Sequence, residues 1–313
     1  MGSSINTNIA AMTALQSLNS TNKQLLTTQN RVSTGFRVAD ASDNAAYWSI
    51  ATTMRGDRSS ISTVADALGL GAATAEIAAK GIESAITIAG KIKDKLVAAR
   101  TPGVDRTKIQ SEITELQESL KAVVDSATFN GQNWLKSDSA DAADDNRTIV
   151  SSFSRASDGT ISIGTITVDL EATRLVDSTS STGASTGGIL DGEIALATGS
   201  DTVTVLDLDI SALEDNAEDL ADLEAMLKGV DVAIEKMTDA ASSLGAVKTR
   251  IDIQKDFAQS LMDAIDTGVG QLVDADMNAE STRLQALQVR QQLGISALGI
   301  ANQSAQMILR LFQ

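Results

Sequence analysis

The side chains that most often carry out chemistry in proteins are missing from this sequence. Its 313 residues include no His and no Cys. Catalysis by Ser-His-Asp or Cys-His groups, imidazole or thiolate metal ligands, disulfides and iron–sulfur clusters are therefore excluded. The absence of Cys also suits a chain that meets an oxidising exterior. The composition therefore offers none of these catalytic or metal-binding groups.

Two weaker patterns remain to be weighed. Gly69-x-Gly71 lacks the third glycine and the preceding strand of a dinucleotide-binding loop, so that interpretation fails. Asp141, Asp144 and Asp145 could contact a cation, but clustered acids in a loop are more often only solvated. Neither pattern predicts a site.

Charge is distributed unevenly along the chain. The net charge is −16, yet residues 1–39 and residues 281–313 each contain three bases and no acid. The two ends together carry +6, so the middle carries −22. We interpret the acid-free ends as segments that share one environment, although two short windows can also lack acids by chance.

The composition also restricts what the chain binds. An acidic total argues against a contact surface for nucleic acid, which needs clustered Lys and Arg. No uncharged apolar run reaches the length that crosses a membrane, and the first residues lack the basic-then-apolar pattern of a cleaved leader. We expect no nucleic acid or membrane partner, and any export to use a route that reads no cleaved leader.

Apolar residues recur every seven positions in the C-terminal third, the pattern of a coiled coil or long helical bundle. A companion row lies three residues on, and as one continuous helix the pattern would extend for roughly 130 Å. Gly268 and Gly270 are candidate interruptions near its middle. The main row is Leu223, Val230, Met237, Leu244, Ile251, Ala258, Ile265, Leu272, Ala279, Ala286, Leu293, Ile300 and Met307.

Matching rows occur in the N-terminal half. A long helix is expected to end at Pro102-Gly103, and a third helix follows it over about 109–127. The rows of the long helix are Tyr47, Met54, Ile61, Leu68, Ala75, Ile82, Ala89 and Leu96, with Ile50, Val64, Ala78, Ala85, Ile92 and Ala99 beside them.

A shorter row of Ala11, Leu18, Leu25 and Val32 precedes these helices. Its companion positions are weak, because Asn22 and Gln29 follow Leu15 there. We expect this helix to be marginal alone and to need a partner to order it.

The texture changes between about 137 and 215, where Asp, Ser, Thr and Gly dominate. Short runs of period two over 161–170 and 203–210 predict half-buried strands. The phase slips by one residue at Gly164 and at Val205-Leu206, as a β-bulge requires. Residues 176–201 are expected to form a surface loop. The chain is thus expected to be mainly α: a long antiparallel bundle formed by both ends, with a small β-rich insertion.

Several motifs resemble those of bacterial flagellin, the subunit of the flagellar filament. Residues 31–46 resemble its RLSTG-x-R-x-x-x-A-x-D-x-AA signature, and 128–131 its QFNG turn. Residues 273–277 resemble its VDADM box, and 287–294, 301–303 and 308–312 its closing segment. The resemblance covers about 1–136 and 215–313, in the right order and at opposite ends.

The resemblance implies a secreted, extracellular filament subunit for swimming motility, exported unfolded through the flagellar type III channel. Such a subunit is a structural protein and not an enzyme, and we expect it to use no cofactor or metal. It implies inner-tube helices at 1–39 and 271–313, a helical core domain at 40–136 and 216–270, and a solvent-facing variable domain at 137–215. The ends are expected to fray in the monomer and to order on assembly. The implied partners are further copies of the chain, alone or mixed with other flagellins, an export chaperone, the filament cap protein and the hook–filament junction protein.

Specific residues follow from the rows and from the motifs. The residues expected to pack in the inner tube are Leu18, Leu25, Val32, Leu293, Ile300, Met307 and Leu311. The residues that carry the family motifs are Arg31, Gly35, Arg37, Asp43, Asn130, Gly131, Asp276, Gln291 and Asn302. Arg31 and Arg37 are either solvated charges or bridges, to neighbouring subunits or to Asp40, Asp43 and Asp276; the sequence favours neither. Gly35 is expected to mark a helix end or turn.

The resemblance also bears on host recognition. Lys91, Lys95 and Glu112 align with the Arg, Leu and Glu that the Toll-like flagellin receptor contacts. Lys lacks the planar fork of Arg, and a Lys in place of Leu puts a charge at an apolar contact, so we expect weak or absent activation. Asn44, Tyr47 and Trp48 depart from the segment that plant receptors read.

Other functions remain to be compared. A hook–filament junction protein shares such helical ends but caps instead of polymerising. A zinc protease inserted in the middle needs His-Glu-x-x-His and is excluded by the absence of His. A non-flagellar secreted coiled coil fits the periodicity but not the motifs at both ends.

Overall fold

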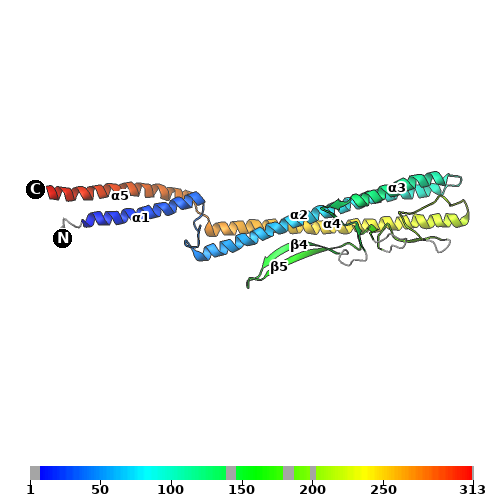
Figure 1. Cartoon of the computed structure of the whole chain (residues 1–313), viewed down its shortest axis with the longest axis horizontal. Helices are drawn as coiled ribbons and strands as arrows, with labels where there is room; N and C mark the ends of the chain where they lie inside the picture. Colours follow the sequence, from blue (N-terminus) through cyan, green and yellow to red (C-terminus); the bar gives the residue numbers. More distant parts are fainter. Residues whose placement is uncertain (1–7, 139–145, 179–186, 198–201, 312–313) are drawn as a thin grey trace. The chain divides into compact units, whose positions relative to one another are not determined.

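The computed structural model describes residues 8–138, 146–178, 187–197 and 202–311, with only the helical backbone described for 304–311. The chain forms two compact units: a terminal unit of 1–58 with 263–313, and a central unit of 59–262. The described helices are α1 (Ile9–Thr34), α2 (Ala45–Ala99), α3 (Arg106–Ser126), α4 (Ala217–Val273) and α5 (Met277–Leu311). The predicted fold class, mainly α with a small β-rich middle, is confirmed (Figure 1).

The terminal unit pairs α1 with α5 in antiparallel fashion (Figure 1). Asn8 near the start of α1 donates from Nδ2 to the carbonyl oxygen of Ala301, 3.0 Å away, while Arg31 near its end meets Glu280. Leu25 is buried in the pair, and Leu18 and Val32 are half-buried. The predicted row of α1 therefore faces α5.

The companion row of α1 differs from the prediction. Thr28 is buried, whereas Leu15 and Gln29 are exposed. Asn22 stays half-buried, and its Oδ1 accepts a hydrogen bond of 2.9 Å from Nε2 of Gln291. Small and polar residues can fill this row because the hydrogen bond compensates the buried amide.

The C-terminal row does not run through one continuous helix. Asp274–Asp276 separate α4 from α5, while Gly268 and Gly270, the predicted interruptions, lie inside α4. Burial of Val269 and Val273 beside them offsets the roughly 1 kcal/mol that a glycine costs a helix. The break also shifts the buried row by one residue, so that Leu287 is buried and Ala286 is exposed.

In the central unit, α2, α3 and α4 share one hydrophobic core. The long helix ends at Ala99, just before the predicted stop at Pro102-Gly103. Three ion pairs fix the antiparallel register of α2 and α4, because each step along one helix is matched by an equal step back along the other. These pairs are Glu76–Lys248, Lys93–Asp231 and Arg100–Glu224.

Glycines let the β-rich segment approach the helices closely. A Cβ on Gly71 of α2 would lie 2.7 Å from Ile149, and one on Gly229 of α4 would lie 2.4 Å from Ile194. A side chain at either position would force the contacting isoleucine to move. Gly71 is thus a packing residue and not part of a phosphate loop.

The middle of the chain contains short strand pairs: β1 (Thr128–Phe129) with β2 (Gln132–Asn133), β3 (Lys136–Ser137) with β6 (Val176–Asp177), and β7 (Ile194–Ala195) with β8 (Thr202–Val203). The longest pair is the hairpin of β4 (Asn146–Arg155) and β5 (Ile161–Asp169). Its register shifts between Val150 and Ser152, opposite Gly164. The predicted β-bulge is therefore present, but the extra residue lies on β4 and not on β5, the strand that contains Gly164.

Two predictions about the middle are wrong in detail. Residues 206–210 bury alternate side chains as predicted but form no strand, because their backbone bonds to α3: Gln110 accepts from the Ile210 amide at 2.9 Å, and Gln117 donates to the Leu208 carbonyl at 3.1 Å. The predicted surface loop over 176–201 contains fully buried Leu190 in its described part.

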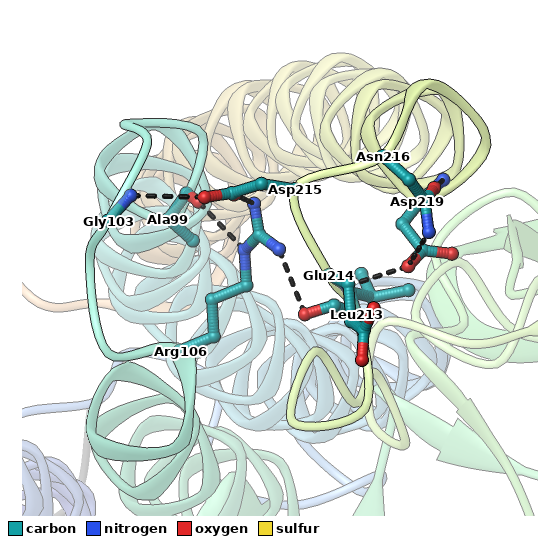
Figure 2. A network of polar contacts seen from close by, with 8 residues as sticks. All are labelled: Ala99, Gly103, Arg106, Leu213, Glu214, Asp215, Asn216 and Asp219. Carbon is teal, nitrogen blue, oxygen red and sulfur yellow. Dashed lines mark hydrogen bonds and ion pairs between the residues drawn. The ribbon is translucent and has the colours of Figure 1, made fainter.

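A buried arginine joins the ends of three helices in the central unit (Figure 2). Arg106, the first residue of α3, donates to the carbonyls of Ala99, at the end of α2, and Leu213, at 3.1 and 2.8 Å. Its Nη2 lies 2.5 Å from Oδ1 of Asp215, whose other oxygen accepts from the Gly103 amide at 3.1 Å. This cluster, the Arg106 clamp, ties the α2–α3 turn to the segment that leads into α4.

One stretch of α2 is long and apolar enough to cross a membrane by length and composition alone. Part of it is buried inside the protein, and the core helix of a helical bundle passes the same test.

Candidate assembly surface

The residues of the family motifs build the joint between helices in the terminal unit. Gly35 ends α1 with a φ of 77°, a left-handed conformation that favours glycine, as predicted. Its carbonyl accepts from the Ala275 amide at 2.9 Å, and Phe36 forms a β-bridge with Asp274. The turn after α1 is thus bonded to the turn between α4 and α5.

Arg37 completes the end of α4. Its Nη2 donates to the carbonyl of Leu272 at 3.0 Å, and its own amide donates to the carbonyl of Val273 at 2.6 Å. A helix leaves its last carbonyls unbonded and carries a partial negative charge there, so a cation at that end stabilises it.

Acidic and amide side chains begin the next two helices. Asn44 accepts from the amides of Ala46 and Tyr47 at the start of α2, and Asp276 accepts from those of Asn278 and Ala279 at the start of α5. Asp43 holds the preceding turn by accepting from the Ala39 amide at 3.0 Å. These contacts satisfy donors that a helix start leaves free.

The partners of the two arginines differ from those considered from the sequence. Arg31 Nη1 lies 3.2 Å from Oε1 of Glu280, with both side chains largely buried, and Arg37 bonds backbone carbonyls. Neither contact involves Asp40, Asp43 or Asp276. Glu280 was missed because it lies one residue before the acid-free window, although a lone acid beside such a window is itself a signal.

In the central unit, Asn130 and Gly131 form the two-residue turn between β1 and β2. Both have positive φ, 50° and 78°. Asn-Gly is the preferred pair for such a turn, because few other residues tolerate that backbone. These two motif residues are therefore explained by the backbone conformation of the turn.

The face of α5 opposite the α1–α5 contact is also apolar. Leu293 and Ile300, the predicted packing residues, are 64% and 68% exposed in the single chain. Their row lies two residues on from that of buried Leu287 and half-buried Leu284 and Gln291, roughly 200° around the helix. We call Ala286, Val289, Leu293 and Ile300 the outer row of α5. Asn302 is exposed as well.

Helix α1 adds further exposed apolar residues to the same unit. These are Ile9, Met12, Leu15 and Leu26, which are all about half exposed or more. No acid lies within α1, or within α5 after Glu280. Met307 lies in α5, but its side chain and that of Leu311 fall outside the described part of the chain.

The predicted receptor-contact positions lie in the central unit. Lys95 of α2 forms an ion pair with Glu112 of α3, and Lys91 is exposed. The pair leaves a positive rather than an apolar group at the position of Lys95. The expected weak activation stays a prediction.

The described residues include no candidate metal site. Among them, no group of three or more Asp or Glu side chains could hold a metal ion. Asp141, Asp144 and Asp145 lie outside the described residues. What the surface can do is associate, through apolar rows that carry little charge.

Comparison with known proteins agrees with this arrangement. Residues 5–140 match the family model for the bacterial flagellin N-terminal helical region, and 227–312 match that for the C-terminal helical region. Flagellin C of Rhizobium meliloti (strain 1021) is 47% identical over 99% of both chains. Flagellin of Brucella melitensis biotype 1 is 40% identical over 99% of both, and flagellin A of Rhizobium meliloti is 39% identical over 99% of this chain and 100% of its own. The chain therefore belongs to the bacterial flagellin family.

Proposed function

We propose that this filament subunit assembles by burying the outer row of α5 and the exposed apolar residues of α1 against other copies. Membership of the family makes the chain a structural subunit of the extracellular bacterial flagellar filament, and not an enzyme. The filament serves motility. The proposal concerns the residues that make the contacts between copies.

The observation that carries it is that α5 is apolar on two nearly opposite faces. One face is covered by α1, and the other exposes Val289, Leu293 and Ile300. A helix that is apolar on both sides is typically covered on both sides, because burial of each apolar face is favourable in water. Open helical stacking supplies the cover, because each subunit then presents two different complementary surfaces.

The charge pattern supports the same placement. Stacked identical subunits bring the same residue of many copies together, and like charges held close in a dry interior repel strongly. Within the described residues of α1, and of α5 after Glu280, the exposed charges are the bases Lys23, Arg283 and Arg290, and neither stretch contains an acid. The acidic middle, facing solvent, favours solubility of the polymer.

We further propose the layers and partners that the family resemblance implies. Residues 1–39 and 271–313 form the inner tube, 40–136 and 216–270 the surrounding helical layer, and 137–215 the solvent-facing part. The chain passes unfolded through the export channel, and a chaperone, the filament cap protein and the hook–filament junction protein act on it in turn. A chain with no Cys and one Pro has no disulfide and few slow isomerisation steps to undo.

The test is the Leu293→Asp variant of the full chain. We expect its free energy of unfolding to stay within about 0.5 kcal/mol of the parent, because the side chain is already exposed. Losing the burial of a Leu, about 1.5–3 kcal/mol per subunit, should raise the critical concentration for polymerisation at least roughly tenfold. Sedimentation of seeded filaments measures it.

The matched control is Gln292→Asp, an added charge at the neighbouring exposed position outside both rows. It should polymerise far better than Leu293→Asp. Equal polymerisation of the two variants would refute the outer row as the contact. Continued growth of the parent protein on seeds also separates a filament subunit from a junction protein, which would stop growth.

A further inference from the structure

The two paired helices of the terminal unit contain a single acid, and that acid is buried. Helices α1 and α5 carry five bases, and Glu280 is the one Asp or Glu in their sequences. Glu280 is 8% exposed, and its Oε1 lies 3.2 Å from Nη1 of Arg31. Its other oxygen, Oε2, is buried and has no hydrogen-bond partner within the described part of the chain. The carboxylate is therefore held between the helices with only one of its oxygens satisfied.

Stability alone does not explain this ion pair. Taking two charges out of water is costly, and apolar side chains of similar volume often replace a buried ion pair without loss of stability. The best-attested use of such a group is to fix the register in which two helices pair. The half-satisfied carboxylate of Glu280 fits that role better than a purely stabilising one.

The apolar contacts of α1 define the register poorly. Leu18, Leu25 and Val32 are spaced by seven residues, so a slip of seven residues brings one of them to the place of the next. The side of α5 that they meet includes Gly294, where an added Cβ would lie 3.2 Å from Leu18, and the amide of Gln291. Apolar burial therefore differs little between the observed register and its neighbours.

The charged pair does distinguish these registers. A slip of seven residues in one direction places Arg31 opposite Leu287 and moves Glu280 beyond the end of α1. The opposite slip places Glu280 opposite Gln24 and moves Arg31 before the start of α5. In either case one charge lies between the helices without its partner, which is strongly unfavourable.

We propose that the Arg31–Glu280 pair selects the register in which α1 and α5 pair, so that every copy presents the outer row of α5 at the same height. The hydrogen bond between Asn22 and Gln291 agrees with this register, but neutral amides cost less to leave unpaired than charges do. The inference rests on the proposed function, because one register is needed where each copy presents the outer row to others. Arg31 and Glu280 are thus positioning residues: they set where the contact surface lies and form no part of it.

The distance between two spin labels reports the register. Gln16 and Gln285 are exposed and the sequence has no Cys, so Gln16→Cys with Gln285→Cys provides two labelling sites. Each site lies six residues from the contact of Asn22 with Gln291, in opposite directions along the pair, so roughly 18 Å along the axis separates them. A slip of seven residues changes this separation by roughly 10 Å.

Every sample is prepared in the same way. Labelled chains are diluted in unlabelled copies of the same variant, so that each measured distance lies within one chain. They are seeded in ammonium sulfate, which strengthens apolar burial and favours pairing in every variant. The whole sample is frozen and measured by pulsed electron paramagnetic resonance, so that copies left out of the filaments are counted. The parent chain should give one narrow distance.

The first variant, Arg31→Met with Glu280→Leu, replaces the ion pair by apolar side chains. The helices should stay paired, but a second distance displaced by roughly 10 Å should appear in at least roughly a tenth of the chains. Arg290→Met removes an exposed arginine of α5 outside the pair and is the matched control, which should keep the parent distance. A single, unchanged distance in the apolar variant overturns the proposal.

The second variant moves the acid and tests the proposal even if the first variant does not fold. In Glu280→Leu with Leu287→Glu, the acid lies seven residues further along α5 and meets Arg31 only after a slip. The main distance should therefore lengthen by roughly 10 Å, whereas loss of a purely stabilising pair would lengthen nothing. Glu280→Leu with Gln288→Glu puts the acid at an exposed position and should not show the longer distance. The parent distance, or no defined distance, in the Leu287→Glu variant contradicts the proposal.

These outcomes are distinct from those that test the proposed function. Parent-like distances in both variants overturn the selection of register and leave the outer row of α5 as the contact. Equal polymerisation of Leu293→Asp and Gln292→Asp instead refutes the outer row and leaves the measured distances unaffected.

Discussion

At the scale of single residues, the family motifs of this chain act through backbone geometry. Gly35, Asn130 and Gly131 supply left-handed conformations, and Asp276 begins a helix. Arg37 ends one. None of these contacts is chemistry on a substrate. The motif residues fix the directions in which the helices leave their joints.

Asp191 gives a prediction at this scale. Burial raises the pKa of its carboxyl above the ordinary 3.8, and the neighbouring carboxylates of Asp177 and Asp207 raise it further, against the amide of Asp177 and the ammonium of Lys121. A raised pKa in the folded state contributes stability that is present at low pH and is lost as the pH rises through the raised value. Asp191→Asn should therefore gain stability relative to the parent as the pH rises from about 4 to 7.

Thermal unfolding of both proteins across this pH range measures the effect. The Asn oxygen can still accept from the Asp177 amide, so the hydrogen bond of 2.7 Å is retained. Asp252→Asn, at an exposed position of α4, should change stability little at any pH. An Asp191→Asn difference that does not vary with pH would contradict the argument.

At the scale of elements, the Arg106 clamp decides how the central helices meet at one end. Arg106 is buried and bonds two backbone carbonyls and one carboxylate. Arg106→Gln leaves these groups without their charged donor, and we expect it to destabilise the central unit by about 2–4 kcal/mol. Arg106→Lys should also lose stability, because an ammonium cannot reproduce the fork of donors. Urea unfolding measures both.

A nearby exposed ion pair is the control for the clamp. Arg100 and Glu224 also join α2 to α4, but both side chains are more than half exposed. Arg100→Gln should cost no more than about 0.5 kcal/mol, because water screens the pair. If the Arg100 and Arg106 variants were equally stable, burial would not be what gives the clamp its strength.

An element could be predicted from the sequence where it packs against another element of the same type. The rows of α2 and α4 were predicted because each helix packs on another helix, and Ile82, Leu96 and Leu244 are fully buried as expected. Residues 206–210 were mistaken for a strand because their partner is the side chain of a helix, which period two does not reveal. The break at 274–276 was overlooked because the seven-residue count continues through it, although Asp276 is a typical first residue before a helix.

The outer row of α5 was predicted only in part. Leu293 and Ile300 belong to a seven-residue row, as the sequence indicates, but that row is not the one that faces α1. Periodicity shows that a face is apolar and does not show which element covers it. The contacts of Asn8, Glu280 and Gln291 depend on the pairing of α1 with α5 and could not be read from either segment alone.

At the scale of the whole molecule, the two compact units differ in how much of their apolar surface they bury. The central unit has a continuous core of its own, built from α2, α3, α4 and the β-rich segment. The terminal unit has a small cluster around Ala51, Val38 and Val273, and most of its large exposed apolar residues lie on α1 and α5. Stability therefore comes mainly from one unit, and the exposed apolar surface comes mainly from the other.

Deletion of residues 281–313 tests this division. It removes nearly all of α5 and leaves α1 with no helix to cover Leu25, and an isolated helix of 26 residues with so thin an apolar face is marginal in water. We expect α1 to lose protection from hydrogen exchange and electron microscopy to find no filaments. The urea transition of the central unit should stay within about 1 kcal/mol of the full chain, because its core residues are untouched. Filaments from the truncated chain, or loss of the central transition, would contradict the division. Full-length Leu293→Asp is the comparison. It keeps the α1–α5 pair, so hydrogen exchange of α1 should match that of the unpolymerised parent while the critical concentration for polymerisation rises, which separates loss of the pair from loss of the outer contact.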